Sequence, residues 1–319
     1  ASDWPLDWPH PAPKRLTGHT SNTLGTEYQM ITGKLLVANR GEIATRICRT
    51  AAELGLPTVA VHPADDAASL HTRKADETLL LPGRGVAAYL DSAAIIAAAL
   101  NAGATAIHPG YGFLSENAAF ATACADAGLT FVGPRPETLA LFGDKHAART
   151  LAAEVGVPTL PGLAAPTSLD DATAFLESLG AGGAVMVKAV AGGGGRGMRP
   201  AFSAQDLPEA FERCRSEAQS AFGDGNLYVE QMVRRARHIE VQLIGDGNAV
   251  SHLWERDCSL QRRRQKIVEL APAPGLDPAL RDKLIAASLS LGEAAGYLNL
   301  GTIEFLVDSD TGAYFFIEA

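Results

Sequence analysis

The sequence predicts an α/β protein whose first part contains a parallel sheet and whose last part is rich in antiparallel strands. Short apolar runs alternate with helical patterns between residues 34 and 132, which is typical of βαβ units. A glycine-rich loop follows a buried-strand pattern near residue 188, and two apolar strands form the end of the chain. These observations indicate at least two domains in a chain of 319 residues.

The first sheet is predicted from apolar runs that are separated by helices of about ten residues. Such connections are right-handed and produce parallel strands, and ligands then bind beyond the carboxyl ends of those strands. The loops at 39–42 and 108–113 are expected there. Strands are expected at 35–38, 58–61, 105–107 and 130–132, and helices at 41–54, 92–101 and 117–127.

A helix-rich connector over 136–155 leads to a proline-containing break at 157–162. The next unit is predicted to contain helices at 170–179 and 204–221, with strands at 185–188 and 227–230.

From Arg237 onward the pattern favours strands. Residues 238–244 alternate polar and apolar side chains, as a half-buried antiparallel strand does. A helix at 278–295 is followed by strands at 302–307 and 313–318, whose short connection predicts a hairpin. The charged segment 255–266 is expected to be a loop that lines a pocket for anions.

Charge and composition exclude several functional classes. The chain has 27 basic and 36 acidic residues, a formal charge of −9, so a general nucleic-acid-binding surface is not expected. No apolar run approaches the roughly 20 residues of a membrane span, so we expect no membrane partner. The four cysteines have no metal-ligand spacing, which favours a reducing, cytoplasmic location. Residues 1–32, rich in proline and containing two tryptophans, are interpreted as a disordered leader, and the alternative is an arm that docks its two tryptophans.

Four consecutive glycines, 192–195, and a fifth at Gly197 follow the strand that carries Lys188. A flexible linker is the simplest interpretation of a glycine run. The basic flanks, Lys188 and Arg196, favour a mobile lid whose backbone amides bind nucleotide phosphates.

Glu304 and Glu318 each lie on an otherwise apolar strand. A carboxylate among core residues is costly unless it is paired or binds a metal. Because the predicted hairpin brings the two strands together, both groups can ionise only beside a cation, and Mg²⁺ or Mn²⁺ fits oxygen ligands near phosphate. The alternative is a pair of solvent-facing glutamates on edge strands.

Other candidates carry weaker signals. Lys145 opens a helical segment after Gly143 and Asp144, and such a lysine is usually on the surface. Glu230 and His238 are candidates for an adenosine pocket, although either is compatible with a plain strand position.

Seven sequence segments together resemble the biotin carboxylase component of biotin-dependent carboxylases, which are ATP-grasp enzymes. They are Val-Ala-Asn-Arg-Gly-Glu-Ile-Ala (37–44), His-Pro-Gly-Tyr-Gly-Phe-Leu-Ser-Glu-Asn (108–117), Gly-Asp-Lys (143–145), Gly-Gly-Gly-Gly-Arg-Gly-Met (192–198), Glu-Arg-Asp-Cys-Ser-Leu-Gln-Arg-Arg (255–263), Gln-Lys-Ile-Val-Glu (265–269) and Phe-Ile-Glu (316–318). The resemblance extends from about Lys34 to Ala319 and leaves only the leader uncovered.

The resemblance implies a fold and its divisions. A Rossmann-like domain over 33–145 precedes a two-lobed ATP-grasp fold that is incomplete at the C-terminus. The expected divisions are a leader at 1–32, the Rossmann-like domain at 33–145, a linker at 146–159, a lid subdomain at 160–235 and the start of the C-terminal lobe at 236–319.

The resemblance also implies a reaction and roles for individual residues. ATP activates bicarbonate as carboxyphosphate, and the carboxyl group then passes to biotin on a carrier. Glu304 and Glu318 hold the metal, Lys266 faces bicarbonate, and Lys266 and Arg264 are the catalytic candidates. The implied nucleotide-binding residues are Lys145, Lys188, Gly193, Gly194, Gly195, Arg196, Gly197, Met198, Glu230, Gln231, Val233, His238 and Gln261.

Three departures from the family pattern matter. Arg264 stands where the family often has histidine, so it stays cationic but does not titrate near neutral pH. Ala191 replaces one glycine of the longest form of the loop. The family's Asn-x-Arg-x-Gln-Val-Glu-His segment does not follow residue 318, so these 319 residues alone are expected to bind nucleotide weakly and not to turn over.

The expected partners are a biotin carboxyl carrier domain, a carboxyltransferase and bicarbonate, with a homo-oligomer for the complete protein. An acyl-CoA carboxylase with a role in fatty acid biosynthesis, or a related carboxylase, is expected, and the sequence does not identify the final acceptor of the carboxyl group. Two alternatives stay open: another ATP-grasp ligase that works through an acyl phosphate, and an inactive fragment or scaffold that retains Mg-ATP binding.

Overall fold

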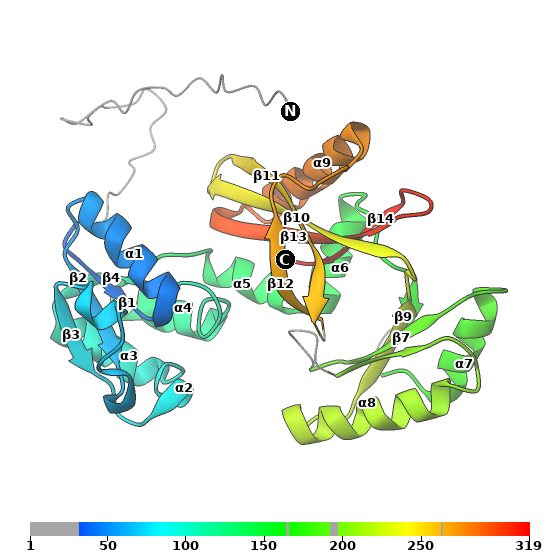
Figure 1. Ribbon diagram of the computed structural model, residues 1–319, viewed down its shortest axis with the longest axis horizontal. Coiled ribbons are helices and arrows are strands. Elements are labelled where there is room, and N and C mark those ends of the chain that lie inside the picture. Colours follow the sequence, from blue (N-terminus) through cyan, green and yellow to red (C-terminus); the bar gives the residue numbers. More distant parts are fainter. Residues whose placement is uncertain (1–31, 164–165, 192–196, 263) are drawn as a thin grey trace, which may run out of the picture. The chain divides into compact units, whose positions relative to one another are not determined.

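The computed structural model describes residues 32–163, 166–191, 197–262 and 264–319, which form three sheets (Figure 1). The predicted leader, except Thr32, lies outside the described residues. The same holds for Gly193, Gly194, Gly195 and Arg196 of the predicted phosphate loop.

The N-terminal sheet is parallel throughout, with the order β3-β2-β1-β4-β5, which confirms the sequence-based prediction. β3 was not predicted, because its exposed edge position allows polar residues in place of an apolar run. The strands are β1 (Lys34–Val37), β2 (Thr58–His62), β3 (Glu77–Leu80), β4 (Ala104–His108) and β5 (Thr130–Phe131). The helices are α1 (Gly41–Glu53), α2 (Gly85–Ala88), α3 (Ser92–Asn101) and α4 (Ala118–Asp126), with 3₁₀ turns at Ala64–Asp66 and His71–Arg73.

The two loops expected at the carboxyl ends of adjacent strands do meet. Asn39, after β1, donates from Nδ2 to the carbonyls of Pro109 (2.7 Å) and Tyr111 (2.8 Å), which follow β4. Gly110 between them has φ +68°, and a Cβ there would lie 2.8 Å from the Asn39 amide nitrogen. Glycine is therefore required at this position.

The middle sheet is antiparallel, in the order β6-β9-β7-β8, and helices α7 and α8 pack beside it. Its core contains Val185, Val187, Phe211 and Val229. The strands are β6 (Gly162–Leu163), β7 (Val185–Ala189), β8 (Met198–Ala201) and β9 (Leu227–Gln231), and the helices are α7 (Leu169–Ser178) and α8 (Leu207–Phe222).

The C-terminal sheet is also antiparallel, in the order β12-β11-β10-β13-β14, and α9 packs on β10 and β11. The predicted hairpin is confirmed as β13–β14. The strands are β10 (Ala236–Asp246), β11 (Val250–Arg262), β12 (Gln265–Leu270), β13 (Leu298–Asp308) and β14 (Tyr314–Glu318), and α9 is Pro278–Ala294.

The expectation of a loop at 255–266 is wrong, because most of this segment belongs to β11 and β12. Its charges are compatible with strands because partners on adjacent strands neutralise them. Arg256, for example, lies opposite Glu240 of β10 and forms an ion pair with it.

Helices α5 (Pro136–Gly143) and α6 (Lys145–Glu154) connect the first sheet to the rest. The Asp144 side chain caps α6 by accepting from the amides of His146 (2.8 Å) and Ala147 (3.1 Å), so Lys145 begins the helix. Ala148 and Ala152 of α6 pack into the core of the C-terminal sheet. The expected domain boundaries stay predictions.

No described helix is long and apolar enough to cross a membrane.

Candidate functional site

A cavity of about 420 Å³ lies between the middle and C-terminal sheets, a typical size for a small-molecule site. Most of the described residues that the sequence identified line it. They are Lys145, Lys188, Met198, Glu230, Gln231, Val233, His238, Gln261, Arg264 and Glu318. A second cavity, of about 730 Å³ beside α8, contains none of the predicted residues.

Three other candidates lie next to this lining. Lys266 and Glu304 bond to each other, and Glu304 bonds to His238 of the lining. The Gly197 carbonyl accepts from the amide of Ala189 at 2.8 Å, at the described end of the glycine loop. The structure therefore brings all the described candidates together.

Two lysines, Lys145 and Lys188, line the part of the cavity formed by α6 and the middle sheet. Lys188 of β7 forms an ion pair with the buried carboxylate of Glu230 on β9. Burial and the charge of Lys188 lower the pKa of Lys145. Two nearby ammonium groups at one cavity favour a multiply charged anion, because its negative charge relieves their mutual repulsion.

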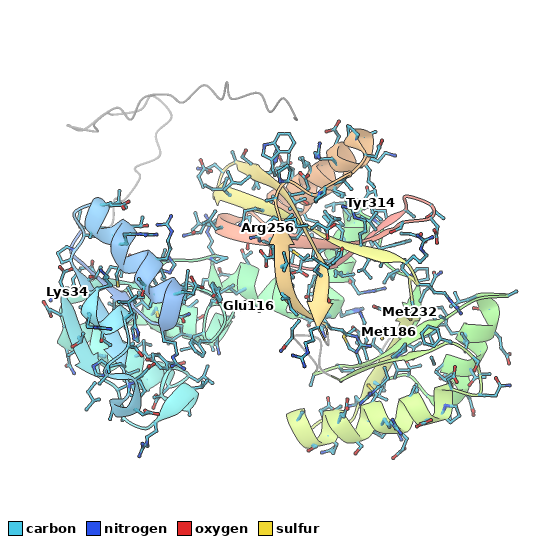
Figure 2. All side chains as sticks on the ribbon, viewed as in Figure 1. Lys34, Glu116, Met186, Met232, Arg256 and Tyr314 are labelled. Atoms are coloured by element: carbon cyan, nitrogen blue, oxygen red, sulfur yellow. The ribbon has the colours of Figure 1, made fainter. Side chains whose placement is uncertain are left out.

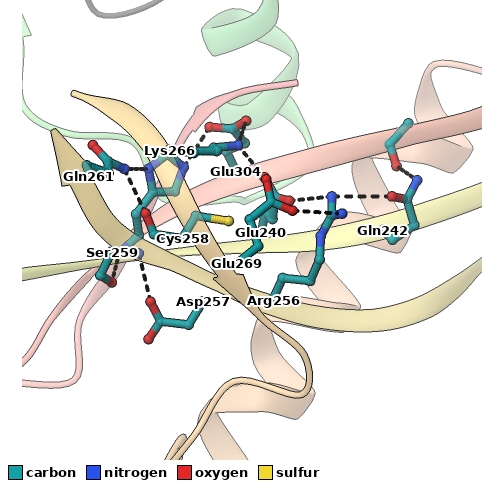
Figure 3. Close-up of polar contacts among 12 residues, drawn as sticks. Glu240, Gln242, Arg256, Asp257, Cys258, Ser259, Gln261, Lys266, Glu269 and Glu304 are labelled. Atoms are coloured by element: carbon teal, nitrogen blue, oxygen red, sulfur yellow. Dashed lines mark hydrogen bonds and ion pairs between the residues drawn. The ribbon is translucent and has the colours of Figure 1, made fainter. Parts of the chain in front are cut away.

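The acidic pair lies on the C-terminal sheet, where Glu318 lines the cavity. Glu304 on β13 and Glu318 on β14 are register partners, as the hairpin prediction required. The side chain of Glu304 accepts a hydrogen bond from His238 (Oε2 to Nε2, 2.6 Å) and another from Lys266 (Oε1 to Nζ, 2.7 Å), as Figure 3 shows for Lys266. Lys266 also pairs with Glu240, so its ammonium bridges two buried carboxylates.

The pKa values of the two carboxylates are displaced in opposite directions. Burial opposes ionisation of Glu304, but the hydrogen bond and charge of His238, with the charge of Lys266, lower its pKa to about 2. Burial and the charge of Glu304 raise the pKa of Glu318. Both carboxylates can therefore be fully ionised together only when an additional cation lies beside them. Paired carboxylate oxygens are the ligands that a hard divalent ion prefers, so the donor set fits Mg²⁺ or Mn²⁺.

His238, Glu240 and Glu304 also form a group whose donor atoms lie within 4.8 Å of one another. Lys266 already bonds to both carboxylates of this group, so their charge is partly compensated. Gln261 lies 2.8 Å from Nδ1 of His238 through its Nε2, and the same nitrogen donates to the Cys258 carbonyl at 2.9 Å. The imidazole of His238 is thus held between Gln261 at Nδ1 and Glu304 at Nε2.

Arg264 connects two elements of the site. Its Nη1 donates to the Met198 carbonyl of β8 at 2.5 Å, and its Nη2 lies 3.6 Å from Sδ of Met186 on β7. Met186 and Met232, both labelled in Figure 2, line the same cavity. Burial and the charge of Arg199 lower the pKa of Arg264, which still leaves it cationic at neutral pH.

Several lining residues were missed by the sequence reasoning. Arg149 of α6, Tyr228 and Ser259 line the cavity, and Glu240 forms an ion pair with Lys266. Glu240 carried the same signal as Glu304, a carboxylate between apolar strand residues, but the alternating pattern of its strand suggested a solvent-facing position. Arg149 had no local signal.

Comparison with known families decides the classification. Residues 31–139 match the model of the biotin carboxylase N-terminal domain, and residues 144–319 match the ATP-binding domain of the carbamoyl-phosphate synthase L chain. The chain belongs to the biotin carboxylase family. The resemblance stated from the sequence is thereby confirmed, and so is the α/β fold with an ATP-grasp portion.

Relatives with this biotin carboxylase portion include pyruvate carboxylases. Pyruvate carboxylase 1 of Caenorhabditis elegans is 52% identical over 89% of this chain and 24% of its own length. The mitochondrial pyruvate carboxylase of Mus musculus is 50% identical over 93% of this chain and 25% of its own length. The chain thus spans about a quarter of these curated relatives. They differ from the acyl-CoA carboxylase type that the sequence suggested.

Two solved biotin carboxylases agree with the fold. The Campylobacter jejuni biotin carboxylase, solved with a βγ-ATP ligand, has a TM-score of 0.84 and 43% identity over 89% of this chain and 64% of that chain. The biotin carboxylase domain of Hydrogenobacter thermophilus 2-oxoglutarate carboxylase was solved as a dimer with MgADP, ADP and bicarbonate. It has a TM-score of 0.85 and 40% identity over 91% of this chain and 64% of that chain.

Proposed function

We propose that this chain binds Mg-ATP and contributes to the ATP- and bicarbonate-dependent carboxylation of biotin on a carrier domain. One observation carries the proposal: Lys145, Lys188 and Glu318 line the same cavity, and Glu304 lies opposite Glu318 on the adjacent strand. Acidic oxygens and basic nitrogens at one cavity form the arrangement that a metal-bound polyphosphate requires. The Hydrogenobacter relative, solved with MgADP and bicarbonate, supports this choice of ligands.

Each group of residues then has a distinct role. Lys145 and Lys188 bind phosphate oxygens, and the segment from Glu230 to Val233 contacts the base. Glu304 and Glu318 would hold Mg²⁺ or Mn²⁺, which neutralises charge on the transferring phosphoryl group when it is bound. The protein's own contribution is to position and neutralise the phosphates.

The acceptor of the phosphoryl group is bicarbonate in this proposal. Lys266, held by Glu240 and Glu304, is suited to attract the bicarbonate anion, and Arg264 supplies a second cation near the cavity. A bicarbonate oxygen attacks the γ-phosphorus and ADP leaves, which gives carboxyphosphate. Carboxyphosphate then breaks down to CO₂ and phosphate. The phosphate accepts the proton from N1′ of biotin, and N1′ forms a bond to the carbon of CO₂.

The remaining partners are proposals on the same basis. They are a biotin carboxyl carrier, a carboxyltransferase and a second copy of the chain, as in the Hydrogenobacter dimer. A cytoplasmic location is also proposed and would be tested by cell fractionation. The final carboxyl acceptor depends on the carboxyltransferase. The solved relatives with this portion include a long-chain acyl-CoA carboxylase, 45% identical over 90% of this chain, as well as pyruvate carboxylases.

Calorimetric titration with Mg-ATP tests the proposal directly. Wild-type protein should bind Mg-ATP more tightly than ATP in the presence of a chelator, and Glu304→Gln or Glu318→Gln should abolish this difference. Glu209→Gln, on an exposed ion pair of α8, is the matched control. Absence of nucleotide binding by folded wild-type protein would refute the proposal.

Binding is the first readout because we also propose that these 319 residues alone do not turn over. ATP hydrolysis stimulated by bicarbonate and free biotin would contradict that second proposal. The alternative, another ATP-grasp ligase, predicts hydrolysis that depends on a different carboxylate or amine and is independent of biotin.

A further inference from the structure

Arg149 is a cavity residue to which neither the sequence motifs nor the proposed function assigns a role. It lies on α6 four residues after Lys145, so both side chains extend from the same face of the helix. Its Nη2 donates to the Leu160 carbonyl at 2.7 Å, and its Nη1 lies 3.5 Å from Oε2 of Glu230. Arg149 therefore connects α6 with the segment that precedes β6 and with β9 of the middle sheet.

The carboxylate of Glu230 faces a different cation at each oxygen. Oε1 contacts the ammonium of Lys188, and Oε2 faces the guanidinium of Arg149. Glu230 is only 4% exposed, so solvent compensates poorly for a lost cation. A buried carboxylate without a cation is strongly unfavourable.

Lys188 has two competing anions if the proposed function is correct. It pairs with Glu230 in the structure, and the proposal requires it to bind a nucleotide phosphate. Turning toward the phosphate would leave Glu230 uncompensated unless a second cation remains beside it. Arg149 is that cation, and its hydrogen bond to Leu160 fixes it in place.

We infer that Arg149 is a positioning residue for nucleotide binding, which neutralises Glu230 so that Lys188 can engage the phosphates. This inference rests on the proposed function, because it requires Lys188 to bind phosphate. Arg149 itself need not touch the nucleotide. Its effect passes through the carboxylate of Glu230, which predicts a specific pattern of coupling between the two residues.

The test compares Mg-ATP dissociation constants of variants of the 319-residue chain. Arg149→Met should weaken Mg-ATP binding about tenfold, and Arg149→Lys should retain part of the affinity because it keeps the charge. In a Glu230→Gln background, Arg149→Met should change the affinity less than about twofold, because the competing charge is gone. Arg213→Met, which breaks the exposed pair with Glu209, is the matched control and should bind as wild type does.

Adenosine distinguishes positioning from a general structural role. Adenosine carries no phosphate, so Lys188 does not have to leave Glu230 when adenosine binds. Arg149→Met should therefore bind adenosine as tightly as the wild-type protein does. An equal loss for adenosine and Mg-ATP, or the same loss in both Glu230 backgrounds, would overturn the inference. The inference would also be overturned if Arg149→Met bound Mg-ATP with the same affinity as the wild-type protein.

Circular dichroism and thermal unfolding check the fold of each variant. If Arg149→Met does not fold, Arg149→Lys and Arg149→Gln provide the same comparison. Failure of the wild-type chain to bind Mg-ATP would refute the proposed function itself. If the wild-type protein binds Mg-ATP and Arg149→Met binds it equally well, only the role of Arg149 is refuted.

Discussion

Nε2 of His238 lies 2.6 Å from Oε2 of Glu304, and this contact links the central strand β10 to its neighbour β13 inside the cavity wall. The other carboxylate oxygen bonds to Lys266 at 2.7 Å. These contacts outweigh the burial of Glu304 and lower its pKa to about 2. Glu304 is therefore ionised at neutral pH and stabilises the fold as well as the site.

Glu304→Gln is expected to reduce the free energy of unfolding by about 1–3 kcal/mol at neutral pH, because two charge-assisted hydrogen bonds weaken. The folded pKa is below the unfolded one, so this contribution is present above about pH 4.3 and is lost as the pH falls toward 2. Urea unfolding of both proteins at several pH values measures the difference. A difference that grows on acidification would contradict the assignment.

Glu240 provides a sharper test of buried charge. Its carboxylate is 1% exposed and pairs with both Lys266 and Arg256 (Figure 3). Glu240→Leu should destabilise the protein by about 3–5 kcal/mol, because two cations lose their common partner. In urea unfolding, Glu209→Gln on the exposed α8 pair should change stability by about 0.5 kcal/mol or less. Similar effects of the two substitutions would show that Glu240 is not structurally important.

The sequence predicted elements best where apolar periodicity is strong. The parallel strands and the β13–β14 hairpin were found because their apolar runs are bounded by clear turn signals. β11 and β12 were missed because their charged residues resemble a loop until the register with β10 is known. Arg256 opposite Glu240 shows that strand pairing, rather than local sequence, makes these charges acceptable.

The same reasoning explains which parts of the site could be predicted. Glu304 and Glu318 were found because each is a carboxylate on an apolar strand, and the hairpin placed them opposite each other. Arg149 could not be found, because its partner Glu230 is 81 residues away and lies on another element. The contact depends on how α6 packs, which no local pattern encodes.

Arg264→His would restore the residue that the family often has at this position, and it should introduce a pH dependence. Arg264 stays protonated near neutral pH, whereas an ordinary histidine titrates near pH 6.5. Mg-ATP affinity of Arg264→His should therefore weaken relative to wild type as the pH rises from about 6 to 8. Calorimetric titration at three pH values measures this. Parallel pH profiles for the two proteins would exclude Arg264 as a contributor of positive charge.

His108 at the end of β4 should make the stability of the chain sensitive to mild acid. Its Nδ1 accepts a hydrogen bond from the Gly110 amide at 3.0 Å, and burial lowers its pKa from 6.5 to about 4. Protonation thus favours the unfolded chain, and the free energy of unfolding should fall between about pH 6.5 and pH 4 by up to 1.36 kcal/mol per pH unit.

Carboxylates titrate in the lower part of the same range, so the informative quantity is the difference between wild type and His108→Asn. Asparagine can accept from Gly110 through Oδ1 but does not titrate. The variant should lose less stability than wild type as the pH is lowered from 6.5 to 4.5. Titration of the His108 ring signals by NMR gives an independent measurement. A midpoint near 6.5 would show that the ring is solvated in the native state and that its hydrogen bond to Gly110 does not persist in solution.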